Sequence, residues 1–230
     1  MDADTPDVAC DGWNGSECEG TVHCPPRCPR FIDKHGDPWT VEFADSGDAD
    51  RLLGMYEAFG TADRAQGIPP ANPDRRVDWV DSLLADGSNV LAERNGRVRG
   101  HAVYTPLDAD CPEIAVFVHP DAQGRGVGTE LCRQLIADAA AGDRDALVLH
   151  VETGNRVART VYDEVGFRTV ERNGDLRMEL PLDDPVATEV RWPPLVREGP
   201  VEPAGTTAPE GSALRQSAGD SPPHRNSESP

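Results

Sequence analysis

Three glycines within five residues, Gly124, Gly126 and Gly128, constrain the fold of this 230-residue chain more than any other feature. An apolar run at 114–118 precedes them, and leucines at helical spacing follow them. Glycine permits positive φ and close backbone approach, and the free N–H groups at a helix start attract anions. The stretch therefore predicts a buried strand, an anion-binding turn and a helix, in that order.

Two other interpretations of the glycine stretch stay open on this motif alone. A dinucleotide site of the Rossmann type also places glycines between a strand and a helix, with an acid such as Glu152 after the next strand. However, the spacing G-x-G-x-G differs from the G-x-G-x-x-G of that site, and residues 119–121 separate the glycines from the strand. A glycine turn that binds no ligand is the other alternative.

A second motif downstream decides between these interpretations. It reads N-x-x-A-x-x-x-Y-x-x-x-G-F and begins at Asn155. Together with the Q-x-x-G-x-G that begins at Gln123, it resembles the GNAT superfamily of acyl-CoA-dependent N-acetyltransferases. The resemblance covers about residues 39–181, and the tract R-A-Q-G-I-P-P at 64–70 also looks like sequences of prokaryotic members.

The resemblance implies a mixed α/β architecture of the α+β class. A central mixed, mostly antiparallel sheet of about seven strands would be flanked by about four helices. In this family the fourth and fifth strands, here expected at 113–118 and 146–151, splay apart to admit the pantetheine arm of the cofactor. The apolar periodicity independently predicts the first two helices at 48–59 and from Pro73.

The resemblance also implies that acetyl-CoA is the cosubstrate. Backbone groups of the fourth strand would contact pantetheine, and N–H groups of the glycine loop would bind the diphosphate. The side chain of Arg125 is expected to add charge-assisted contacts to a phosphate, and Asn155 to bond the pantetheine region while capping its helix. The predicted cofactor-binding residues are Val116, Phe117, Val118, Gln123, Gly124, Arg125, Gly126, Val127, Gly128, Thr129 and Asn155.

Three residues are predicted to be catalytic by the same resemblance: Tyr162, Glu113 and Asn155. When an amine attacks the thioester, the intermediate expels a thiolate, and Tyr162 at the motif position would protonate that sulfur. The structural alternative for Tyr162 is a packed aromatic. The attacking ammonium must lose a proton, and Glu113 at the start of the fourth strand is the expected base, with His101 and His150 as rivals.

Four of the six cysteines lie in the first 28 residues, spaced C-x7-C-x5-C-x3-C. This segment has few aliphatic side chains, and four thiolates suffice for one tetrahedral structural zinc that would supply folding energy. An iron–sulfur cluster, disulfides and free thiols are the alternatives. The predicted metal ligands are Cys10, Cys18, Cys24 and Cys28.

Composition divides the chain into three regions. Residues 1–38 form the cysteine-rich segment and residues 39–182 the acetyltransferase domain. Residues 183–230 are rich in proline and poor in apolar side chains, so they are predicted to be a disordered acidic tail.

The chain carries 41 acidic residues against 22 basic ones, for a net charge of -19. This charge disfavours binding to nucleic acid or to an anionic membrane surface. Lys34 is the sole lysine, and lysine depletion with a chain-wide acid excess resembles haloarchaeal proteins, in which molar salt shortens the Debye length to about 3 Å. With no apolar stretch long enough to span a bilayer and no signal segment, the protein is expected to be cytoplasmic.

The sequence thus predicts an N-acetyltransferase that transfers the acetyl group of acetyl-CoA to a primary amine by direct attack in a ternary complex. The acceptor could be a small amine or a protein amino group. The loop at 60–73, which contains Asp63 and Arg64, is expected to shape its site. A GNAT-like module that senses acyl-CoA or docks a partner without turnover is the alternative.

Overall fold

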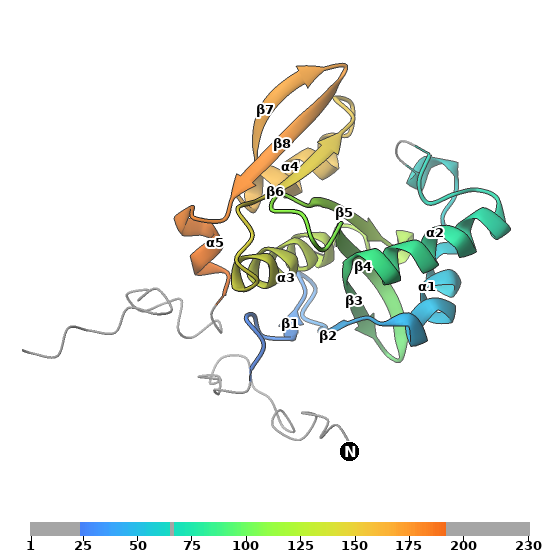
Figure 1. Ribbon diagram of the computed structural model, residues 1–230. Coiled ribbons are helices and arrows are strands. Elements are labelled where there is room, and N and C mark those ends of the chain that lie inside the picture. The colour runs from blue at the N-terminus through green and yellow to red at the C-terminus, as the bar shows by residue number, and fades with distance from the viewer. Residues whose placement is uncertain (1–23, 65–66, 192–230) are drawn as a thin grey trace, which may run out of the picture.

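The computed structural model describes residues 24–64 and 67–191, which build one eight-stranded sheet with helices on both faces (Figure 1). The strands follow the order β1-β2-β3-β4-β5-β6-β8-β7. Their bounds are β1 Arg30–Ile32, β2 Pro38–Phe43, β3 Ser88–Arg94, β4 Arg97–Thr105, β5 Glu113–Val118, β6 Ala146–Val151, β7 Arg168–Asn173 and β8 Asp175–Pro181. The helices are α1 Ala49–Tyr56, α2 Pro73–Asp86, α3 Val127–Ala141, α4 Arg156–Glu164 and α5 Pro185–Glu189, with short 3-10 turns η2 Ser46–Asp48, η3 Thr61–Asp63 and η4 Pro120–Ala122.

The predicted mixed, mostly antiparallel sheet is confirmed, with one more strand and one more helix than the expected seven and four. The additional strand, β1, pairs with β2 through Arg30, Phe31 and Ile32, and the Phe31 ring stacks on Trp39 at 5.9 Å between centroids. The additional helix, α5, begins with a proline after an aspartate cap and buries Ala187. Both β1, which precedes residue 39, and α5, which follows residue 182, pack on the domain although they lie outside the predicted domain boundaries at 38/39 and 182/183.

The only parallel neighbours in the described sheet are β5 and β6, and they touch at one register pair, Glu113 with Val148. On its other edge, β5 pairs with β4 along its whole length, from Glu113 to Val118. Beyond that single pair β5 and β6 diverge. The predicted splay between these two strands is therefore present in the fold.

Alternating residues of β5 face two separate apolar cores. Ile114 belongs to the core that α3 and α4 cover, together with Leu131 of α3. Phe117 belongs to the second core, under α1 and α2, together with Leu52 and Trp79. The sheet is thus a partition with α3 and α4 on one face and α1 and α2 on the other (Figure 1).

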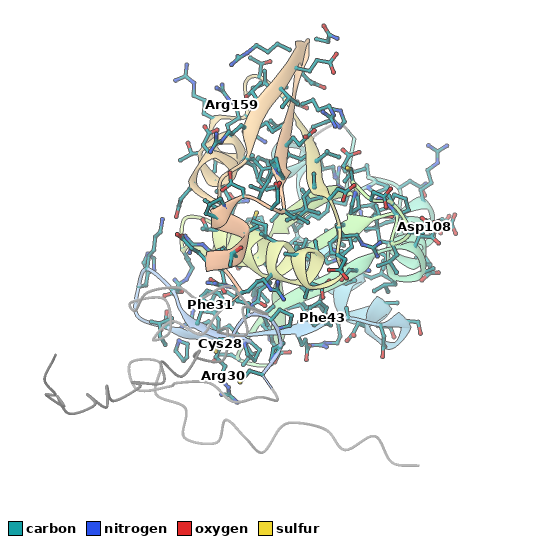
Figure 2. All side chains as sticks on the ribbon, turned by 60° about the vertical axis from the view of Figure 1, so that its left-hand side comes forward. Cys28, Arg30, Phe31, Phe43, Asp108 and Arg159 are labelled. Atoms are coloured by element: carbon teal, nitrogen blue, oxygen red, sulfur yellow. The ribbon has the colours of Figure 1, made fainter. Side chains whose placement is uncertain are left out.

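A segment at residues 27–37, which we name the strap, packs along α3 before the chain enters β2. Its Arg27 forms a buried ion pair with Glu130 in the first turn of α3, at 2.6 Å from Nε to Oε1. Gln134 of α3 donates a hydrogen bond to the Cys28 carbonyl oxygen at 2.7 Å. Figure 2 shows Cys28, Arg30 and Phe31 grouped at one edge of the molecule, where the strap begins.

Among the helices of the described residues, none combines the length and apolar character needed to cross a bilayer.

Candidate active site

The divergence of β5 from β6 leaves part of the β5 backbone unpaired on its β6 side. Val116, Phe117 and Val118 lie beyond the single register pair, and only β4 pairs with them among the described strands. A backbone edge of this kind can hydrogen-bond an extended ligand that enters between the strands. These are the three strand residues that the sequence predicts to contact pantetheine.

The glycine loop follows directly at the end of β5. Gly124 and Gly126 have φ angles of 72° and 92°, a left-handed backbone that glycine adopts without strain. Gly126 is the N-cap of α3, and no described side chain caps the N–H groups that follow it. The first helical bond runs from the Glu130 N–H to the Gly126 carbonyl, so the amides of residues 127–129 are open to an anion.

Several side chains around the glycine loop pack in the protein interior or bond the protein itself. An anion at this loop would therefore be bound mainly by backbone N–H groups. Val127 and Thr129 are buried. The Gln123 amide donates back to the Val118 carbonyl oxygen at 3.2 Å, which ties the loop to the end of β5. Because the Gln123 N–H donates to the Pro120 carbonyl oxygen at 3.3 Å, the amides left for the predicted main-chain anion site are those of residues 124–129.

The guanidinium of Arg125, which the sequence predicts to contact a phosphate, makes three contacts within the protein. It donates to Asp33 Oδ2 at 2.5 Å, to His35 Nδ1 at 2.8 Å and to an Asp37 carboxylate oxygen, all in the strap. The side chain is thus directed into a pair of carboxylates 88 and 92 residues away in sequence. No local pattern in the glycine motif could have indicated these partners.

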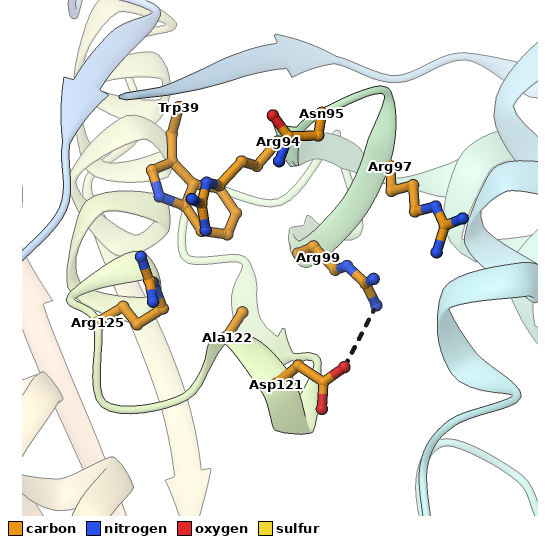
Figure 3. Close-up of a pocket in the computed structure, with 8 residues that line it drawn as sticks. All are labelled: Trp39, Arg94, Asn95, Arg97, Arg99, Asp121, Ala122 and Arg125. Atoms are coloured by element: carbon orange, nitrogen blue, oxygen red, sulfur yellow. Dashed lines mark ion pairs between the residues drawn. The ribbon is translucent and has the colours of Figure 1, made fainter. Parts of the chain in front are cut away.

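A cavity of about 410 Å³ lies on the β4 side of the glycine loop (Figure 3). Several of its arginines already have partners: Arg94 pairs with Asp37 at 2.7 Å and lies over the Trp39 ring, and Arg99 bonds the His119 ring at 2.8 Å. Two of its four arginines, Arg94 and Arg125, thus pair with carboxylates of the strap, and Arg99 lies 4.0 Å from Asp121. Its lining residues are Trp39, Arg94, Asn95, Arg97, Arg99, Asp121, Ala122 and Arg125.

Tyr162 projects from α4 into the core shared with α3. Its side chain is 8% exposed and packs edge-on against Phe167, with ring centroids 5.9 Å apart. Burial, with a smaller contribution from Cys132, raises the pKa of Tyr162 well above its usual range. No described residue hydrogen-bonds its hydroxyl, so the phenol keeps its proton and has no competing partner.

The rival base His101 belongs to a closed hydrogen-bond chain. Asn89 donates its amide to the carbonyls of Leu83 and Gly87, so its oxygen accepts from His101 Nε2 at 2.9 Å. The other ring nitrogen, Nδ1, then accepts from the Tyr56 hydroxyl at 2.5 Å. Burial lowers the pKa of His101 to about 3, so the ring is neutral and both its nitrogens are occupied.

The remaining two base candidates, Glu113 and His150, form one pair. His150 Nδ1 lies 3.0 Å from Glu113 Oε1, and both side chains are about half exposed. They share the sheet face that α1 and α2 cover nearer to β4, at the point where β5 and β6 begin to diverge. The sequence named both residues as alternatives but contained no signal that they touch.

Asn155 caps α4, as its alternative structural role requires. Its Oδ1 accepts from the Ala158 N–H at 3.1 Å. The cap occupies the oxygen and leaves the Asn155 amide N–H groups for a second contact, so capping and ligand binding are compatible.

The loop between α1 and α2 is described at residues 60–64 and 67–72. Asp63 accepts from the Gly60 N–H at 2.9 Å, and Arg64 donates to the Phe59 carbonyl at 2.9 Å. The Nε atom of Arg64 is buried without a hydrogen-bond partner among the described residues. This loop therefore presents a guanidinium with unused hydrogen-bonding capacity.

The predicted zinc ligands fall only partly within the described residues, since Cys10 and Cys18 lie outside them. Cys28 is buried and Cys24 is half-buried. Residues 24–64 and 67–191 contain no group of three or more His, Cys, Asp or Glu side chains placed to hold a metal ion. Cys132 is also buried, and burial raises its pKa to about 12, which excludes it as a thiolate nucleophile at neutral pH.

Sequence comparison finds relatives that are named as N-acyltransferases or N-acetyltransferases. L-amino acid N-acyltransferase MnaT of Escherichia coli is 31% identical over 100 residues, which are 41% of this chain and 58% of MnaT. Phosphinothricin N-acetyltransferase of Alcaligenes faecalis is 32% identical over 137 residues, 56% of this chain and 69% of that protein. The chain thus spans less than two thirds of the length of MnaT.

Solved structures share the fold. The GNAT domain of S. lividans PAT superposes with a TM-score of 0.61 at 22% identity, covering 71% of this chain and all of that domain. The structure of yncA from Salmonella typhimurium, solved with its cofactor acetyl-CoA, gives 0.52 at 26% identity, covering 64% of this chain and 95% of the other. The model of the Acetyltransferase (GNAT) family matches residues 49–167, about half of the chain, and the chain belongs to this family.

Proposed function

We propose that this chain is an acetyl-CoA-dependent N-acetyltransferase that transfers the acetyl group to a primary amine by direct attack in a ternary complex. The observation that carries the proposal is the single register pair between β5 and β6, with the uncapped start of α3 at the mouth of the gap. That arrangement offers an open strand edge for pantetheine and free amides for its diphosphate.

The cosubstrate would be held mainly by backbone groups. Residues 116–118 would bond the pantetheine amides, and the amides at 124–129 would bind the diphosphate. The Asn155 amide N–H groups, left over from capping, would reach the pantetheine region. Each of these contacts is a prediction that a complex with coenzyme A would test directly.

The chemical step removes two protons from the acceptor ammonium and delivers one to the leaving sulfur. Because the Glu113 carboxylate accepts from His150 Nδ1–H, the lone pair of Nε2 is available to take a proton from the attacking ammonium. The neutral amine then attacks the thioester carbon, the C–S bond breaks, and Tyr162 donates its proton to the leaving thiolate. The second proton of the nitrogen passes to solvent as the amide forms, and solvent reprotonates Tyr162. The buried phenol suits this role because it stays protonated until the thiolate forms.

The acceptor class we infer is a small amine of amino-acid type. The names of the relatives, an L-amino acid N-acyltransferase and a phosphinothricin N-acetyltransferase, favour it. The incompletely bonded guanidinium of Arg64 in the α1–α2 loop supports it, since such a group can bind a carboxylate. A protein amino group is the alternative.

One assay tests both activity and acceptor. Thiol release from acetyl-CoA is followed in molar KCl with amino acids, simple amines and lysine peptides as acceptors. We expect turnover with at least one amino acid and little with lysine peptides. Tight acetyl-CoA binding without turnover on any acceptor would support the sensing module and reject the enzyme.

Three finer proposals concern the surroundings of this domain. We propose that Cys10, Cys18, Cys24 and Cys28 bind one structural zinc, that the acidic, proline-rich residues beyond α5 act as a tail, and that the protein is a cytoplasmic, haloarchaeal-type member adapted to molar salt. Metal analysis of protein purified without chelator should give about one zinc per chain for a site built from four thiolates. Absence of stoichiometric metal would reject the zinc proposal and leave the enzyme proposal intact.

A further inference from the structure

Lys34 crosses the face of the glycine loop from outside the family region. Its backbone N–H donates to the Arg125 carbonyl oxygen at 3.0 Å. Its aliphatic stem lies over Gly126, because a Cβ built on that glycine would be 3.5 Å from Lys34 Cε and 3.6 Å from Cγ. The strap thus brings a lysine stem against the residue that starts α3.

Hydrogen bonds and ion pairs hold the strap against α3 and the glycine loop. Burial alone would raise the pKa of Asp33, but hydrogen bonds from the Asp37 and His35 N–H groups, from Trp39 Nε1 and from Arg125 lower it well below its usual range. The ionised Asp33 carboxylate therefore organises the turn on which Lys34 sits. Arg27 anchors the other end of the strap to α3 through its buried pair with Glu130.

The carboxylates nearest to Lys34 in the strap are already paired. Asp33 and Asp37 both bind Arg125, and Asp37 also binds Arg94. The Lys34 side chain is exposed and makes no hydrogen bond or ion pair with any described residue. It is therefore an uncompensated cation beside open amides, in a chain whose net charge is -19.

We propose that Lys34 is a phosphate ligand for the cofactor, and that its ammonium completes the anion site that the α3 N-terminus begins. Arg125 is then a positioning residue, because it fixes the strap and leaves the charge contact to Lys34. The inference rests on the proposed function, which supplies coenzyme A as the anion. Both the diphosphate and the 3′-phosphate of coenzyme A share the required chemistry, and the geometry at Gly126 favours the diphosphate.

The sole lysine allows a direct protection experiment. The full chain is treated with an N-hydroxysuccinimidyl ester, and acylation of the Lys34 peptide is quantified by mass spectrometry with no ligand, with coenzyme A, with dephospho-coenzyme A or with pantetheine. We expect the first two ligands to slow the acylation and pantetheine to leave it unchanged. Protection by coenzyme A alone would assign the contact to the 3′-phosphate, and equal protection by pantetheine or none by coenzyme A would overturn the proposal.

Binding measurements on variants show whether Lys34 contacts coenzyme A directly or is only covered by it. Lys34→Gln should raise the Kd of coenzyme A about tenfold, as expected for loss of a charge-assisted contact, while Lys34→Arg should restore most of the affinity. The matched control is Arg172→Gln, which removes one exposed charge on β7 and should leave Kd unchanged. An unchanged Kd in Lys34→Gln would reject the Lys34 assignment alone, whereas wild type that binds no coenzyme A would reject the proposed function itself.

Discussion

Two buried tyrosines on opposite faces of the sheet have different hydrogen-bonding environments. Tyr56 and Tyr162 are 0% and 8% exposed, and burial raises the pKa of both. Both pack edge-on against a phenylalanine, Tyr56 on Phe59 and Tyr162 on Phe167. Yet the Tyr56 hydroxyl is committed to His101, while no described residue bonds the hydroxyl of Tyr162.

The difference separates a structural phenol from one that can react. A buried hydroxyl with a fixed acceptor stabilises the fold, and its proton is not free to move. The Tyr162 hydroxyl has no partner among the described residues and is not one of the buried side-chain atoms without a partner, so solvent or a bound ligand can reach it. The same substitution, Tyr→Phe, should therefore have opposite consequences at the two positions.

The largest expected effect is on catalysis in Tyr162→Phe. We expect kcat to fall about 100-fold, at the lower end of what a positioned general acid contributes. The melting temperature should change little, because no intramolecular hydrogen bond is lost. Thiol release and thermal unfolding in molar KCl measure the two quantities, and an unchanged kcat would remove Tyr162 from the proton-transfer step.

The matched change, Tyr56→Phe, should affect stability and spare catalysis. It leaves the buried Nδ1 of His101 without a donor, which lowers the free energy of unfolding by about 1–3 kcal/mol. Denaturant titration checks this value, and kcat should be retained. A loss of kcat as large as that of Tyr162→Phe would show that the two phenols do not differ in role.

The enclosed hydrogen bonds of His101 also predict that the stability of the protein depends on pH. Because the pKa of His101 is about 3 in the folded protein and 6.5 in its usual range, the unfolded chain binds a proton that the folded chain excludes. Stability is therefore complete above pH 6.5 and falls by about 1.4 kcal/mol per pH unit as the pH drops towards 3. Denaturant titrations at pH 7, 6 and 5 should show this slope, and His101→Gln should flatten it. A wild-type protein equally stable at pH 7 and 5 would contradict the neutral, enclosed ring.

The smallest effect on catalysis is expected for substitutions in the exposed pair formed by Glu113 and His150. Glu113→Gln leaves His150 in place but weakens its orientation, so kcat/KM should fall about tenfold, less than for loss of a whole acid or base. Glu171→Gln, an exposed change on β7, is the control and should leave kcat/KM unchanged. If His150→Gln has no effect while Glu113→Gln abolishes turnover, Glu113 is the base and His150 only its neighbour.

The parts of the site that follow from local sequence were predictable. The glycines at 124–128 need only their own φ angles and the start of a helix, and the motif around Tyr162 needs only one helix face. Strand splay also followed once the family resemblance identified β5 and β6. These features depend on residues that are close together in the chain or that recur as a pattern.

Some contacts could not be predicted from the sequence. They are hydrogen bonds between side chains that lie far apart in the chain. Arg125 with Asp33 and His101 with Tyr56 are examples, 92 and 45 residues apart. Apolar periodicity carries no information on which buried polar groups meet, because every such pair depends on packing of whole elements. For the same reason the sequence did not indicate that the Arg125 guanidinium bonds Asp33, His35 and Asp37.

The single register pair between β5 and β6 has a mechanical consequence. Among the described residues, β5 and β6 form no register pair beyond Glu113 and Val148, and α3 packs across both strands. An extended molecule with amide groups that lies in the gap between these strands would hydrogen-bond the free strand edges and so connect the two halves of the sheet, β1–β5 and β6–β8, as an additional strand would. The cosubstrate would then be a temporary structural component of the sheet, and amide exchange along β5 should slow when it binds.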